Sequence, residues 1–161
     1  MFFSLFLLVL VIVLDQLTKL WVVNSFQLYE SLEIISGFFN LTYLTNKGAA
    51  FGFLAGVDGA WRHYFFLTLA CIALVLLCLA WYRMRKDHPF YGPALALIAG
   101  GAIGNVIDRI RLGSVVDFLD FYVAGHHWPA FNVADSAITV GVTLFLLTTI
   151  LEERQKKNIK E

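Results

Sequence analysis

Four long apolar stretches constrain this chain more than any other feature of its sequence. They run from Phe2 to Val23, Tyr64 to Tyr82, Pro93 to Ile110 and Val133 to Leu151. A hydrocarbon core about 30 Å thick takes about 20 helical residues to cross, at about 1.5 Å each, and every stretch approaches that length. Of the 161 residues, 59% are apolar and 15% are charged, which is too few charges for a water-soluble domain. The sequence predicts one integral-membrane domain over residues 1–161 with four transmembrane helices.

Basic residues predict which side of the membrane each helix end faces. One basic group follows the second stretch and another follows the fourth, and their members are Arg83, Arg85, Lys86, Arg154, Lys156, Lys157 and Lys160. The positive-inside rule places both groups in the cytoplasm, so four spans put both termini there. The connections 24–63 and 111–132 then face outward. The formal net charge is zero, which gives no reason to expect nucleic acid as a partner.

The outward connections carry further structure. Residues 28–46 partly alternate between apolar and polar side chains and end at the turn sequence Asn46-Lys47-Gly48, which predicts a small extracytoplasmic β-sheet. Residues 48–56 are apolar but too short to span, so we expect a short interfacial helix there. Residues 115–123 could pair with the sheet or continue the third helix, and their pattern decides for neither. The expected fold class is therefore membrane all-α with a small outer sheet.

Ionisable residues inside spanning segments invite a functional interpretation, because burying one near a helix centre costs about 2.5 to 3.5 kcal/mol or more. Asp15 and Lys19 lie four residues apart on the first helix. This spacing favours a structural ion pair, with Lys19 extending outward to the interface. Asp108 and Arg109, near the outer end of the third helix, could form an interfacial ion pair or position a polypeptide.

A pair of carboxylates at the outer boundary suggests hydrolytic chemistry. Asp135 opens the fourth helix, where an acid alone is better explained as a helix cap. However, Asp117 and Asp120 lie in an apolar outer segment at a similar depth, so folding could bring one of them to Asp135. Two carboxylates about 3 Å apart do not both ionise comfortably, so one keeps a proton while the other accepts a proton from water. Such a pair can hydrolyse an amide without a covalent intermediate.

Other kinds of function find less support in the sequence. No His-Glu-x-x-His motif is present, and adjacent His126 and His127 are more typical of a surface loop than of a metal site, so we expect no metal and no cofactor. Ser136 lacks the motif of a nucleophile elbow. A proton-coupled carrier would need a relay of acids across the membrane, but the candidate acids all lie in the outer half. A non-catalytic membrane scaffold would tolerate replacement of these acids by amides.

Five blocks of sequence occur in order along nearly the whole chain, namely Asp15–Lys19, Thr45–Phe51, Gly100–Arg109, Val115–Phe118 and Phe131–Ser136. Together they resemble the lipoprotein signal peptidases, the signal peptidase II family. The resemblance implies a membrane aspartic endopeptidase that removes the signal peptide from diacylglyceryl-modified bacterial prolipoproteins, cutting before the lipidated cysteine. It also implies an active site near the outer, periplasmic face of the bacterial inner membrane, with membrane lipids and these prolipoproteins as partners. We expect the chain to act as a monomer.

The resemblance also implies a set of site residues. Asp117 and Asp135 would be the catalytic pair, which leaves Asp120 without an assigned role. Asp15 and Lys19 would be structural. The residues that would bind the substrate or support the pair are Asn46, Asn105, Asp108, Arg109 and Asn132.

Overall fold

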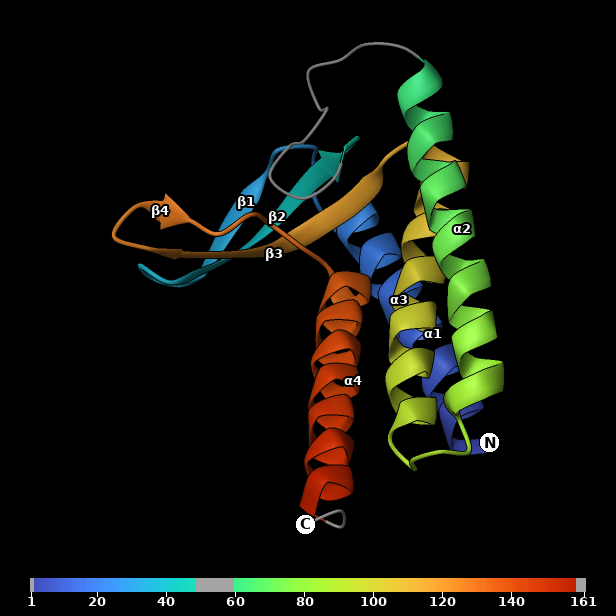
Figure 1. Cartoon of the computed structure of the whole chain (residues 1–161). Helices are drawn as coiled ribbons and strands as arrows, with labels where there is room; N and C mark the ends of the chain where they lie inside the picture. The colour runs from blue at the N-terminus through green and yellow to red at the C-terminus, as the bar shows by residue number, and fades with distance from the viewer. Residues whose placement is uncertain (1, 49–59, 159–161) are drawn as a thin grey trace.

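The computed structural model describes residues 2–48 and 60–158 of the chain. Its long helices form a bundle, and a small sheet projects from one end of that bundle (Figure 1). The helices are α1 (Phe2–Ser25), α2 (Ala60–Met84), α3 (Tyr91–Leu112) and α4 (Val133–Asn158). Each is long and apolar enough to cross a membrane and contains the corresponding apolar stretch of the sequence. The predicted fold class is confirmed, while the interfacial helix expected over residues 48–56 falls almost entirely outside the described residues.

The sheet contains four antiparallel strands in the order β1-β2-β3-β4. The strands are β1 (Ser31–Ile35), β2 (Phe39–Asn46), β3 (Val115–Val123) and β4 (His126–His127). Residues 115–123 therefore pair with the sheet and do not continue α3. The reason is Gly113, which adopts a left-handed conformation with φ of 73° and donates its N–H to the Arg109 carbonyl, so that it ends the helix. Strand β3 thus starts close to the C-terminal end of α3.

Helix α3 is the centre of the bundle, because it contacts α1, α2 and α4. A methyl group added at Gly104 would lie 2.5 Å from Asp15 Oδ2, so only glycine lets α1 and its carboxylate approach α3 this closely. The sheet joins the bundle through a small core in which Val22 of α1 packs against Val116 and Phe118 of β3. The start of α1 and the end of α4 lie at the end of the bundle opposite the sheet (Figure 1).

Candidate active site

A pocket of about 820 Å³ lies where the sheet meets α3 and α4. Five residues expected in the site line it: Asn46, Asn105, Arg109, Asp117 and Asp135. The segment 128–131 forms one wall, and residues 138–140 of α4 extend the lining along that helix. The fold therefore brings together residues from β2, β3, α3 and α4 that lie far apart in the sequence.

Asp117 lies on β3 with its side chain buried in the pocket lining. Asn132 Nδ2 donates a hydrogen bond of 2.8 Å to Asp117 Oδ1, and the Asn46 side chain donates another. Burial of the carboxyl, and next the nearby charge of Asp135, raise the pKa of Asp117 from 3.8 to about 7, although the two amide hydrogen bonds favour its charged form. At neutral pH, Asp117 therefore keeps a proton far more readily than an ordinary aspartate does.

Asp135 lies in the first turn of α4 and accepts a hydrogen bond of 2.8 Å from Asn105 Nδ2. Its carboxylate does not serve as the helix cap. Asn132 precedes the helix and its Oδ1 accepts the Asp135 N–H at 2.9 Å, while Asp15 Oδ1 from α1 accepts the Ala134 N–H at 2.9 Å. Two of the free N–H groups at the start of the helix are thus satisfied by other side chains, and Asp135 lines the pocket.

Two asparagine amides connect the carboxyl groups of Asp117 and Asp135. Asn132, which is fully buried, donates from Nδ2 to Asp117 Oδ1, and also to Val116 O at 3.1 Å and Asn105 Oδ1 at 3.3 Å. Asn105 in turn donates to Asp135. Because these amides are themselves held by several partners, they fix the directions in which the two carboxyl groups point.

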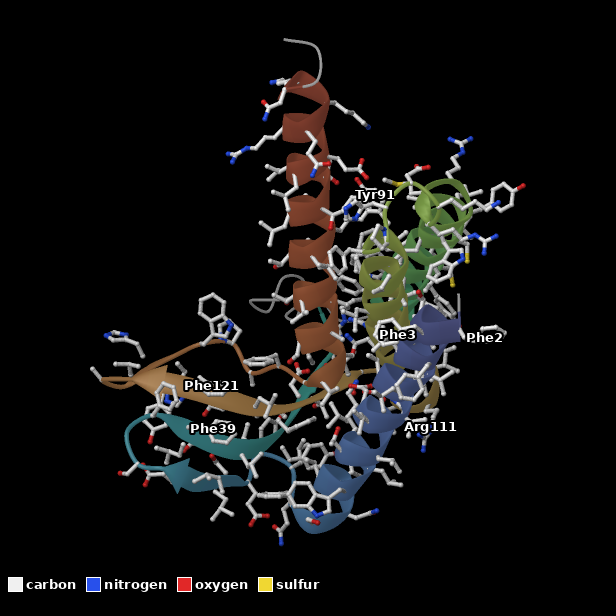
Figure 2. The ribbon with its side chains drawn as sticks, turned by 90° about the horizontal axis from the view of Figure 1, so that it is seen from below. Phe2, Phe3, Phe39, Tyr91, Arg111 and Phe121 are labelled. Atoms are coloured by element: carbon white, nitrogen blue, oxygen red, sulfur yellow. The ribbon has the colours of Figure 1, made fainter. Side chains whose placement is uncertain are left out.

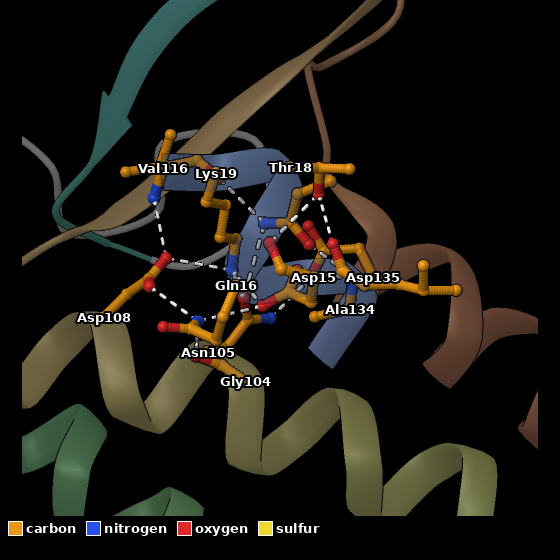
Figure 3. Close-up of polar contacts among 12 residues, drawn as sticks. Asp15, Gln16, Thr18, Lys19, Gly104, Asn105, Asp108, Val116, Ala134 and Asp135 are labelled. Carbon is orange, nitrogen blue, oxygen red and sulfur yellow. Dashed lines mark hydrogen bonds and ion pairs between the residues drawn. The ribbon is translucent and has the colours of Figure 1, made fainter. Parts of the chain in front are cut away.

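Lys19 lies behind the pocket at the centre of a buried polar cluster (Figure 3). Its ammonium lies 2.9 Å from Asp15 Oδ2, 2.9 Å from Asp108 Oδ2 and 2.9 Å from Asn105 Oδ1. An ammonium group has three N–H donors, and these three acceptors use all of them. The expected pair with Asp15 is present, but the expectation that Lys19 extends outward was wrong. Asp108 and Asn105 of α3 provide hydrogen-bond acceptors in the interior, and these replace the water molecules that would solvate the ammonium at the interface.

Each carboxylate partner of Lys19 also holds the backbone next to a pocket aspartate. Asp15 accepts the N–H of Ala134, the residue before Asp135, and Asp108 Oδ2 accepts the N–H of Val116 at 3.2 Å, the residue before Asp117. Asp108 therefore pairs with Lys19 and β3, and the suggested ion pair with Arg109 is not what holds it. Sequence reasoning missed this link, although three ionisable residues at a similar depth in α1 and α3 were a usable signal.

Gln16 is another member of this cluster that the sequence did not single out. Its Nε2 donates to Asp108 Oδ1 at 3.0 Å, to the Gly104 carbonyl at 3.2 Å and to Asp15 Oδ2 at 3.2 Å (Figure 3). These contacts join α1 to α3 beside the Lys19 ion pairs. A glutamine that follows an aspartate on one spanning helix carries no obvious signal of partners on another helix.

Arg109 places a positive charge at the pocket. Its guanidinium donates to the Gly48 carbonyl at 3.3 Å and to the Asn105 carbonyl at 3.5 Å, and it lies 5.7 Å from the centre of the Phe66 ring. It interacts electrostatically with Asp117, Asp135 and Asp108. Arg109 thus connects α3, α2 and the end of β2 beside the two carboxyl groups.

Known proteins are similar to this chain in sequence and in fold. Residues 7–151 match the family described as Signal peptidase (SPase) II. A protein named Lipoprotein signal peptidase from Geobacter sulfurreducens is 50% identical over 145 residues, which cover 90% of this chain and 89% of that one. One from Syntrophus aciditrophicus is 48% identical over 149 residues, covering 92% of each. A solved bacterial membrane enzyme, 33% identical, matches 97% of this chain and 92% of its own with a TM-score of 0.86. The chain therefore belongs to the signal peptidase II family and is a membrane peptidase.

Proposed function

We propose that this protein is an aspartic endopeptidase that removes the signal peptide from diacylglyceryl-modified bacterial prolipoproteins, cutting before the lipidated cysteine. The observation that carries the proposal is the pairing of Asp117 and Asp135 in one pocket, with the pKa of Asp117 raised to about 7. An aspartic peptidase needs one carboxyl group that keeps a proton beside one that accepts a proton. The names of the relatives support the substrate class.

The proposed reaction uses a water molecule held between the two carboxyl groups. Asp135 accepts a proton from this water as its oxygen attacks the scissile carbonyl, while protonated Asp117 donates a hydrogen bond to the carbonyl oxygen. The tetrahedral intermediate then breaks its C–N bond as the proton on Asp135 passes to the leaving nitrogen. Asn105 and Asn132 keep the carboxyl groups in position, and Arg109 and Asn46 contact the substrate backbone in the pocket.

We place the pocket near the outer, periplasmic face of the bacterial inner membrane, with both termini in the cytoplasm. The basic end of α4 and the basic residues after α2 support this orientation, because they lie at the bundle end opposite the sheet (Figure 1). A diacylglyceryl group and an apolar signal helix partition into the bilayer, so the substrate reaches the pocket sideways from lipid. A monomer is sufficient, because one chain supplies both aspartates and all of their supports.

The proposed substrate is tested with the purified protein in detergent micelles. A diacylglyceryl-modified prolipoprotein is compared with the same precursor whose cysteine carries no lipid. We expect cleavage of the modified precursor only, and mass spectrometry should show a mature product that begins with the lipidated cysteine. Equal cleavage of both precursors would contradict the proposed requirement for the lipid. Cleavage of neither would contradict the proposed function.

The raised pKa of Asp117 also predicts the pH dependence of the reaction. Above about pH 7 this carboxyl loses its proton, so it no longer donates to the scissile carbonyl and repels charged Asp135. We therefore expect kcat/KM to fall as the pH rises through about 7. The profile should be measured with one micelle composition throughout. A constant kcat/KM across this range would show that Asp117 does not act as the acid.

Protonation of Asp117 also changes the free energy of unfolding. Because the folded-state pKa of Asp117 is raised above 3.8, the folded chain holds the proton more tightly than the unfolded chain does. The stabilisation that results is complete below about pH 4 and is lost as the pH rises through about 7. The thermal unfolding midpoint should show this decline in wild type, and the decline should be smaller in Asp117→Asn.

A further inference from the structure

The pocket wall formed by residues 128–131 is attached to the sheet at two ends. At its inner end, Phe131 exchanges backbone hydrogen bonds with Leu119 at 2.8 and 3.1 Å, and Asn132 follows with its own contacts. At its outer end, the Trp128 N–H donates to the Phe121 carbonyl at 2.8 Å, and β4 precedes it with only two residues. Strand β4 pairs with β3 through only two exposed residues, which is too short a pairing to be stable by itself. The outer end of the wall therefore depends on side-chain contacts as well.

That support comes from one side-chain pair, Asp120 and His127, which we call the Asp120–His127 clamp. His127 Nδ1 lies 2.8 Å from Asp120 Oδ1 and 3.1 Å from Oδ2. A carboxylate only accepts hydrogen bonds, so Nδ1 carries the proton and donates. Asp120 is buried and also accepts from Asn40 Nδ2 of β2 at 3.0 Å, while the His127 ring stacks on Tyr122 with centroids 4.8 Å apart. The clamp therefore ties β4 to both β3 and β2.

The clamp is not part of the pocket lining. Neither Asp120 nor His127 is among the described residues that line it, whereas Asp117 on the same strand is. The sheet also carries an aromatic group. The rings of Phe121 and Phe39 lie close together, with centroids 4.7 Å apart (Figure 2). The Phe131 ring stacks on Phe121 with centroids 5.8 Å apart. Side chains of successive strand residues point to opposite faces, so Phe121 and Asp120 lie on different sides of β3.

We propose that Asp120 and His127 are positioning residues, which hold the outer end of the 128–131 wall where the substrate binds. The inference rests on the proposed function, since it names a determinant of substrate binding in the same pocket. Phe131 fixes the inner end of the wall separately, through its backbone hydrogen bonds to Leu119, and the next residue, Asn132, donates to Asp117. Loss of the clamp therefore displaces the wall without disturbing the two catalytic carboxyl groups, and it affects KM and not kcat.

The test compares four variants in mixed micelles, with KM expressed as the mole fraction of lipidated prolipoprotein. Asp120→Ala and His127→Ala should each raise KM about tenfold, because each removes a hydrogen bond to a charged group, and kcat should stay within about twofold. His127→Asn should restore most of the wild-type KM, because its amide offers an N–H donor close to the position of Nδ1. His126→Ala is the matched control on the same strand, and its KM should equal that of wild type. The double variant Asp120→Ala/His127→Ala should be no worse than either single variant.

Hydrogen exchange measured by mass spectrometry tests the clamp without relying on activity. The Trp128 amide should exchange faster in Asp120→Ala and His127→Ala than in wild type, His127→Asn or His126→Ala, while the Phe131 amide should be unchanged. Unchanged KM and unchanged exchange at Trp128 in the folded alanine variants would overturn the inference. So would a fall in kcat at constant KM, or a His127→Asn variant no better than His127→Ala. If wild type cleaves nothing, the proposed function fails and the exchange measurement alone decides on the clamp.

Discussion

Replacement of Asp117 or Asp135 by asparagine is expected to lower kcat by about a thousandfold or more, because each change removes one half of the acid–base pair. Asparagine keeps the size of the side chain, but its amide cannot accept a proton from water or exchange one with the leaving nitrogen. The measurement is single-turnover cleavage of the lipidated prolipoprotein by each purified variant. Both variants should bind the substrate, since the pocket keeps its shape.

A control variant distinguishes the loss of catalysis from the loss of folding. Asp87→Asn makes the same substitution at an exposed residue between α2 and α3, and it should retain wild-type kcat. The thermal midpoint of Asp117→Asn at pH 7 and above should equal or exceed that of wild type, because a buried charge has been removed. Substantial cleavage by both folded variants would rule out the aspartic mechanism and would require a different pair of catalytic groups.

Replacement of Lys19 by methionine is expected to destabilise the fold by about 3–5 kcal/mol, the cost of removing one partner from a buried ion pair. Asp15 and Asp108 would then face one another in the interior without a cation. Their hold on the backbone beside the two pocket aspartates would weaken, so kcat should fall as well. Unfolding should be followed by heat in detergent, and kcat on the fraction that remains folded.

The matched control is Lys156→Met, which removes an exposed lysine near the end of α4. Lys156 lies 3.6 Å from Glu152 and its side chain is 74% exposed, whereas that of Lys19 is 3% exposed. Exposed pairs contribute about 0–1 kcal/mol, so this variant should unfold close to wild type. If Lys19→Met matched the control in both stability and kcat, the buried cluster would have no part in holding the site.

The sequence predicted the spanning helices and the outer sheet because length, hydropathy and alternation are local properties. It did not decide the state of residues 115–123. These residues are buried at most positions and form an apolar run that Asp117 and Asp120 interrupt, which fits either a strand or a helix. The end of α3 depends on the conformation of Gly113. A glycine in that position permits a helix end but does not require it.

The orientation of the Lys19 side chain could not be predicted from the sequence of α1 alone. Its partners Asn105 and Asp108 lie on another helix, and Gly104 provides the space for Asp15 between them. Whether a lysine reaches water or the interior depends on which helices pack together, and no pattern within α1 specifies that. The positions of the two pocket aspartates likewise follow from tertiary contacts. The two aspartates and their candidate supporting residues were therefore predicted through the resemblance, whereas the hydrogen bonds between them were not.

The link between Lys19 and the backbone beside each aspartate has a consequence for how the enzyme matures. Asp117 is synthesised before α4, and chains insert into the membrane from the N-terminal side. Until α4 joins the bundle, Asp15 has no Ala134 N–H to accept and Asp117 has neither its Asn132 donor nor its partner carboxylate. In the proposed mechanism, a nascent chain with three helices therefore lacks one of the two catalytic carboxyl groups. The proposed catalytic pair forms only when the final helix joins the bundle.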